Sequence, residues 1–175
     1  QLDHTSSLTL SGDVYRSQME QIYHTATNIV PFREFGNETS ESRGWNVLAK
    51  YSKALSAGSE YSFQSYYDYV ERDEYFFGYS TETIDFDFQH QFKAWQNHNF
   101  IWGLGFRYIQ DKISAHQIVT ANNQESDIRL WSGFIHDEIS LLPNKLWLTL
   151  ASRFEHNTYT GSEVQPNARL MWQLN

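Results

Sequence analysis

The sequence predicts an all-β fold: an antiparallel up-and-down meander of about eight strands that forms a transmembrane β-barrel or a segment of one. Segments of alternating apolar and polar residues recur along most of the 175 residues, with almost no helical period between them. Aromatic residues make up 17% of the chain and only three prolines occur, a composition that favours strands. The connections between the segments alternate between short and long, which is typical of a meander with one trimmed end.

Each expected strand is identified by side chains of period two, because successive residues of a strand point to opposite faces. In the clearest case Leu146, Leu148 and Leu150 share one side, while Thr149 and Arg153 share the other. One segment, 128–139, is ambiguous because both of its sides carry apolar residues. The eight expected strands are 8–15, 43–53, 59–69, 83–92, 99–108, 128–139, 145–156 and 163–174.

The connections divide into two kinds. Short, turn-like stretches lie at 55–59, 95–99 and 141–144, and long polar stretches, expected to be loops, lie at 21–42, 71–82 and 109–126. No Gly/Ser-rich linker and no abrupt change in amino-acid composition divides the chain. We therefore expect residues 1–175 to form a single barrel unit or barrel segment.

The apolar side of these strands is expected to face lipid. It is rich in large rings such as Phe86, Trp102 and Phe106, which would overfill the interior of a small water-soluble barrel. The opposite side mixes Asp, Gln, Arg and Ser with Gly and Ala, as expected for the wet interior of a membrane barrel. The expected surroundings of the chain are therefore outer-membrane lipid.

Several classes of function are excluded or disfavoured. There are no cysteines, and a net charge of −8 without a basic cluster argues against a nucleic-acid partner. No cofactor motif, nucleophile elbow or metal-ligand spacing is present, so we expect no cofactor, no metal site and no enzyme. Asp85 and Asp87 share a face and could act as an acid–base pair, but an ion-pair network with Arg107 is the favoured interpretation.

Residues 134–173 carry a resemblance to a known family. The sequence "FIHDEISLLPNKLWLTLASRFEHNTYTGSEVQPNARLMWQ" resembles the barrel of TonB-dependent outer-membrane receptors, which show an aromatic-x-x-Asp-Glu strand, a short turn and a W-x-L-T-L strand followed by Y-T-G-x-E-x-Q-P-x-A-R. The stretches "HNFIWGLGFRYIQDKI" (98–113) and "DFDFQHQF" (85–92) are similar to preceding strands of the same family. Nothing in the chain resembles the family's plug domain or its TonB-binding segment.

The resemblance implies a function as well as a fold. It implies part of a plugged barrel of about 22 strands in the bacterial outer membrane. Such a barrel takes up a scarce nutrient, most often a ferric siderophore or a similar metal chelate, with energy from the TonB complex through parts absent here. The alternative is a self-contained eight-stranded outer-membrane barrel with a structural or adhesin role; a membrane protease or lipase is a weaker third.

Ligand recognition is expected in the long loops, because loops on a rigid scaffold carry most binding residues. The first long loop offers aromatic side chains and a cation, a combination suited to a flat or anionic chelate. In the barrel interior two arginines could also meet an anionic ligand, although pairing with Asp85, Asp87 or Glu155 is the competing expectation. The candidate ligand-binding residues are Tyr23, Phe32, Arg33, Phe35, Arg107 and Arg153.

Overall fold

The structure is a computed structural model that describes residues 5–56, 58–115 and 125–174. The described residues form eight strands and no helix, and therefore contain no helix that could cross a bilayer. The strands are β1 (Ser6–Ala26), β2 (Arg33–Ser56), β3 (Ser59–Asp73), β4 (Phe77–Trp95), β5 (His98–Ala115), β6 (Glu125–Leu142), β7 (Leu146–Asn157) and β8 (Gly161–Trp172).

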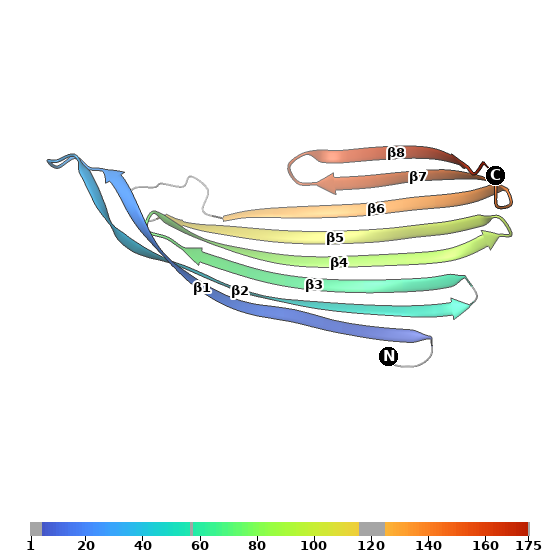
Figure 1. Cartoon of the computed structure of the whole chain (residues 1–175), viewed down its shortest axis with the longest axis horizontal. Helices are drawn as coiled ribbons and strands as arrows, with labels where there is room; N and C mark the ends of the chain where they lie inside the picture. The colour runs from blue at the N-terminus through green and yellow to red at the C-terminus, as the bar shows by residue number, and fades with distance from the viewer. Residues whose placement is uncertain (1–4, 57, 116–124, 175) are drawn as a thin grey trace.

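All eight strands belong to one sheet in which each strand pairs, antiparallel, with its neighbours in sequence. The predicted all-β meander is therefore confirmed (Figure 1). Strands β1 and β8 form the two edges and do not pair with each other, so the described sheet is open. The strands are 12 to 24 residues long, against the five or six of an ordinary globular sheet.

The sheet has a polar face and an apolar face, as the alternation predicts. The register places Lys50, Gln64, Asp87, Gly105 and Ser132 in one row across β2 to β6, and these residues belong to the polar face. The neighbouring row on the other side belongs to the apolar face and contains Ala49, Ser65, Phe86, Phe106 and Trp131.

No hydrophobic side chain in the described part of the chain is buried, and rings such as Trp131 are more than half exposed. A single sheet has no second layer of its own, so its apolar face must find cover elsewhere.

The short connections are confirmed and the long ones are partly wrong. The expected loop 21–42 is mostly strand, because β1 continues to Ala26 and β2 begins at Arg33. The expected loop 71–82 shrinks to residues 74–76. In the expected loop 109–126, β5 runs to Ala115 and β6 begins at Glu125; residues 116–124 lie outside the described residues.

The physical reason for these errors is the environment of the strand ends. Where both faces of a strand meet water, neither face needs apolar residues and the period-two signal disappears. Beyond the pair of Glu41 with Asp73, β2 has no partner on its β3 side, and β1 and β2 continue alone as a two-stranded hairpin. We call residues 19–40 the ribbon; in Figure 1 it extends past the ends of the other strands and bends.

The turns between β2 and β3, β4 and β5, and β6 and β7 all lie at the opposite end of the sheet from the ribbon (Figure 1). The first residues of β1 and the last residues of β8 lie at that same short-turn end. The sheet is therefore trimmed at one end and extended at the other.

Candidate functional site

A pocket of about 370 Å³ lies on the polar face across the middle of β2 to β7. Its charged lining consists of three cations and two carboxylates: Lys50, Arg107, Arg153, Asp85 and Asp87. Ser62, Gln64, Gln89 and Ser132 supply hydrogen-bonding groups between the charges. The pocket therefore suits a polar or anionic group better than an apolar one.

The two arginines predicted from the sequence meet in this pocket, and each also has a carboxylate partner. Arg107 Nε lies 2.7 Å from Asp85 Oδ2, directly across the β4–β5 register. Arg153 donates to the Glu155 carboxylate two residues along β7. Half of each arginine side chain remains exposed, so each pair leaves guanidinium donors facing the pocket.

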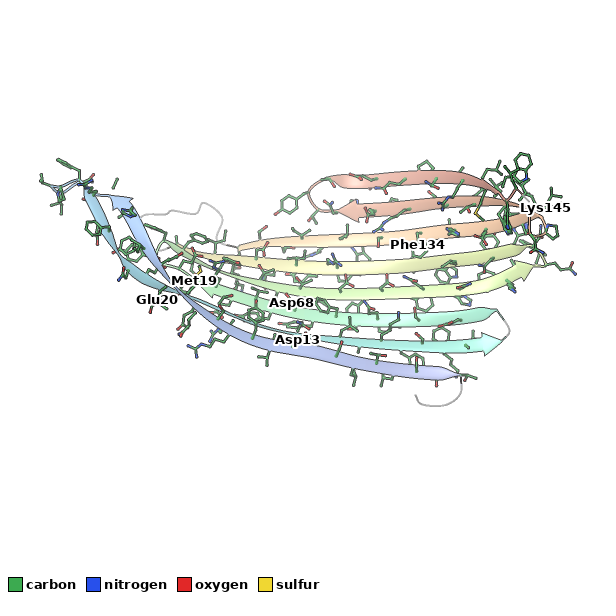
Figure 2. The ribbon with its side chains drawn as sticks, viewed as in Figure 1. Asp13, Met19, Glu20, Asp68, Phe134 and Lys145 are labelled. Atoms are coloured by element: carbon green, nitrogen blue, oxygen red, sulfur yellow. The ribbon has the colours of Figure 1, made fainter. Side chains whose placement is uncertain are left out.

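Two glycines of β5 make room on the polar face for side chains of β6. A Cβ at Gly103 would lie 2.5 Å from the Phe134 ring and 2.7 Å from the Phe88 carbonyl oxygen, so no side chain fits there. Phe134, labelled on the middle of β6 in Figure 2, lies over this glycine. Gly105 in turn leaves room for Ser132 Oγ, which a Cβ would approach to 2.6 Å.

A second candidate region is an aromatic cluster where the ribbon meets the β3–β4 turn. The Tyr23 ring stacks on Tyr75 with centroids 4.0 Å apart and planes 16° apart. Phe76 meets the Tyr75 ring edge-on at 5.1 Å. Gly36 makes room for this arrangement, since a Cβ there would lie 2.8 Å from the Tyr23 ring. We call Tyr23, Tyr75 and Phe76 the ribbon cluster.

Two carboxylates accompany the ribbon cluster. Tyr23 donates its hydroxyl proton to Glu34 at 3.2 Å, and the Glu38 carboxylate accepts from the Tyr75 amide and from Gln21. Hydrogen bonding to Tyr75, desolvation and the nearby Glu34 charge raise the pKa of the Tyr23 hydroxyl above its ordinary value. The Tyr23 hydroxyl therefore stays a neutral hydrogen-bond donor at physiological pH, and the carboxylates of Glu34 and Glu38 are acceptors beside the same cluster.

The structure separates the four residues predicted from the first long loop. Tyr23 lies on the polar face of β1, whereas Arg33 and Phe35 lie on the opposite face of β2. Phe35 is 70% exposed, and the centroid of its ring lies 6.1 Å from the centroid of the His24 ring. Phe32 lies at the ribbon tip, where its amide donates to the Ile29 carbonyl at 2.6 Å. Only Tyr23 reaches the ribbon cluster.

Sequence reasoning missed Tyr75, Phe76, Glu34 and Glu38. A signal was present for the first two, because Tyr75, Phe76 and Phe77 form a run of aromatic residues within a polar connection. No signal pointed to the glutamates, since a carboxylate in a polar strand is ordinary. No group of three or more metal-ligating side chains occurs in the described ranges.

The family model described as "TonB dependent receptor-like, beta-barrel" matches residues 2–175. No curated protein matches the chain. The matching family is a receptor family, as the resemblance in residues 134–173 predicted.

Two solved structures share the fold. A siderophore receptor, PirA from Pseudomonas aeruginosa, superposes with a TM-score of 0.66 at 15% identity over 99% of this chain. PirA from Acinetobacter baumannii superposes with a TM-score of 0.63 at 14% identity over the whole chain. The alignments cover 35% and 30% of those receptors, so this chain spans about a third of their length. With its whole described sheet matched by the family model, the chain belongs to the TonB dependent receptor-like β-barrel family.

Proposed function

We propose that this chain forms part of the barrel wall of an outer-membrane receptor that takes up a ferric siderophore or a similar metal chelate. The family supports a receptor role, and the two similar structures are siderophore receptors. The chain corresponds to about a third of those receptors, so the ligand and partners of the whole protein are inferred.

One observation carries the proposal: the sheet has an uncovered apolar face and a polar face with a charged pocket. In a membrane barrel the apolar face contacts lipid and the polar face lines the interior. Trp131 on the apolar face is 55% exposed, an arrangement that is stable in lipid and prone to aggregate in water. The pocket with Arg107 and Arg153 then opens into the barrel interior.

We place ligand recognition on the polar side of the ribbon and in the charged pocket, which lies on the same face of the sheet and nearer the short-turn end. The ribbon cluster presents rings that can stack on a flat chelate, and Glu34 and Glu38 accept hydrogen bonds from it. Arg107 and Arg153 attract its anionic groups. Arg33 and Phe35 lie on the opposite face of the ribbon and Phe32 lies at its tip, so these three residues contribute less to ligand binding.

The chemistry of such a receptor is binding and gated passage rather than catalysis. The TonB complex is the proposed energy source, acting through parts of the receptor outside this sheet. In the sheet itself, β1 to β5 are paired with their neighbours along most of their length, which favours a rigid wall over a moving part.

The test is chelate binding by the full-length receptor. Ferric catecholate and ferric hydroxamate chelates are the probes, and Tyr23→Ala combined with Tyr75→Ala is the variant. We expect about a tenfold or greater loss of affinity for the chelate that the wild type binds, because two stacking rings are removed. Phe35→Ala is the matched control, since it removes a ring from the same ribbon on the opposite face. Equal losses in both variants would contradict the assignment of recognition to the polar side.

A further inference from the structure

A carboxylate and a histidine, in hydrogen-bond contact, interrupt the apolar face near the short-turn end of the sheet. Asp137 lies on that face of β6, in register with Phe100 on β5 and Leu150 on β7. Its Oδ2 lies 2.7 Å from Nδ1 of His98, and the two side chains are only 14% and 24% exposed. A carboxylate on a lipid-facing surface is costly, so its presence there calls for a partner.

The pair leaves Asp137 half satisfied. Its Oδ1 is buried and has no hydrogen-bond partner among the described residues. The His98 ring is fixed between the Trp95 edge at 5.2 Å and the Phe100 face at 6.0 Å. With the imidazole fixed in this way on Oδ2, the carboxylate keeps an acceptor position that His98 does not fill.

A groove crosses the apolar face from β5 to β8 beside this carboxylate. Its volume is about 590 Å³, and its lining is mostly apolar: Phe100, Ile135, Leu150, Pro166 and Ala168, with Asp137 as its one charged residue. The small side chains of Pro166 and Ala168 on β8 lie beside the bulky Leu150 and Ile135, which leaves the hollow. Phe100, Asp137, Leu150 and Ala168 share one register row across β5 to β8, and Ile135 and Pro166 lie in the next apolar row, nearer the middle of the strands.

We propose that this groove and the Asp137–His98 pair bind a membrane phospholipid whose headgroup carries an ammonium. An acyl chain lies along the apolar lining, and the ammonium donates a hydrogen bond to the Asp137 carboxylate at the short-turn end. Charge complementarity selects this headgroup, because a purely anionic phospholipid would bring its charge against a carboxylate. The proposal rests on the proposed function in one respect: the apolar face must lie in the membrane.

The experiment is native mass spectrometry of the full-length receptor in detergent. Phosphatidylethanolamine and phosphatidylglycerol with identical acyl chains are the probes. The wild type should bind phosphatidylethanolamine about tenfold better, and Asp137→Asn should remove most of that preference, because charge-assisted hydrogen bonds are the strong ones. Asp127→Asn is the matched control, since Asp127 lies on the same face of β6 at the other end and pairs with Arg129.

The groove is tested separately, so that the proposal does not depend on how Asp137→Asn folds. Ala168→Leu fills the groove and should weaken both lipids, whereas Ala49→Leu, on the apolar face of β2, should not. Equal binding of the two lipids by the wild type would overturn the headgroup assignment. So would a loss in Asp127→Asn as large as that in Asp137→Asn.

Chelate binding in the same samples separates this inference from the proposed function. If the wild type binds a ferric chelate but shows no lipid preference, the lipid site is wrong and the receptor role stands. If the lipid preference is found but no chelate binds, the lipid site stands and the receptor role fails. The two proposals can therefore be rejected independently.

Discussion

At the scale of single residues, glycines decide where large side chains can cross the sheet. Phe134 can lie over β5 only because Gly103 has no side chain. The Tyr15 ring lies over Gly44 in the same way, as Tyr23 does over Gly36. Glycine weakens the interior of a strand, but at these positions it leaves the space that an aromatic ring occupies, a role that glycine commonly has inside strands.

Gly103→Ala should destabilise the receptor by about 1–3 kcal/mol, the usual cost of overpacking. The added Cβ would meet a backbone carbonyl oxygen as well as the Phe134 ring, and the carbonyl cannot move away without disturbing the ladder. Gly133→Ala is the control, because its Cβ would come no closer than 3.4 Å to Leu104. Thermal unfolding of both variants in detergent measures the difference, and equal midpoints would contradict the packing argument.

A second residue-scale feature is the paired carboxylate Glu71, which lies beyond the apolar part of β3. A hydrogen bond from Tyr69, and then the bonds and charge of Arg43, hold the pKa of Glu71 below its ordinary value of 4.5. Arg43 donates to both carboxylate oxygens of Glu71, at 2.8 to 3.0 Å. This interaction joins β2 and β3 just below the ribbon.

Lowering the pH should weaken the interaction of Arg43 with Glu71 that joins β2 and β3. A pKa that is lower in the folded state means that the stabilisation is fully present above 4.5 and is lost as the pH falls through the folded value. Glu71→Gln should therefore make the thermal midpoint of the receptor less sensitive to pH on the acid side of 4.5. Glu163→Gln, an exposed change on β8, should leave the pH dependence as it is in the wild type. A wild-type curve that matches the Glu71→Gln curve would show that the pair contributes nothing.

At the scale of elements, the sequence predicts strands well where the two faces meet different surroundings. The predicted segment 145–156 differs from β7 (Leu146–Asn157) by one residue at each end, because Leu146, Leu148 and Leu150 lie on the apolar face and Thr149 and Arg153 on the polar face. The sequence does not predict the ribbon as strand because one of its faces is exposed and the other is covered only by Tyr75 and Phe76, so neither face needs a continuous apolar row. The pairing of Arg107 with Asp85 was foreseen from adjacent strands, whereas the Tyr23–Tyr75 contact joins two connections that no local pattern relates.

Deleting residues 25–38 from the full-length receptor should abolish chelate uptake and leave the protein in the membrane. The deletion removes Glu34, Gly36 and Glu38 and leaves residues 21–24 to join Glu20 to its register partner Thr39, which is an ordinary hairpin loop length. Uptake of a radioactive ferric chelate and membrane fractionation measure the two outcomes. Unchanged chelate affinity would rule out recognition on the ribbon and leave Arg107 and Arg153 as the remaining candidates.

At the scale of the whole molecule, the sheet of the proposed barrel separates lipid from the barrel interior. Which face meets lipid can be measured with two adjacent residues at the same depth in the bilayer. Trp147 lies on the polar face of β7 and Leu148, the next residue, lies on the apolar face. In a receptor without other tryptophans, Leu148→Trp combined with Trp147→Leu should give a ring that brominated lipid quenches strongly. The native Trp147 alone should be quenched weakly, because its ring faces the interior. Equal quenching at the two positions would show that the faces are assigned wrongly.

The connection of neighbouring strands as hairpins has a consequence for how such walls change over generations. Because β1 starts and β8 ends at the same side of the sheet, the eight strands amount to four hairpins laid side by side. A duplication or loss of one hairpin would leave every remaining turn on its original side of the membrane, whereas a change of a single strand would invert all that follow. Barrels of this construction are therefore expected to differ in size by pairs of strands, and genetic insertions of whole hairpins should be tolerated where insertions of one strand are not.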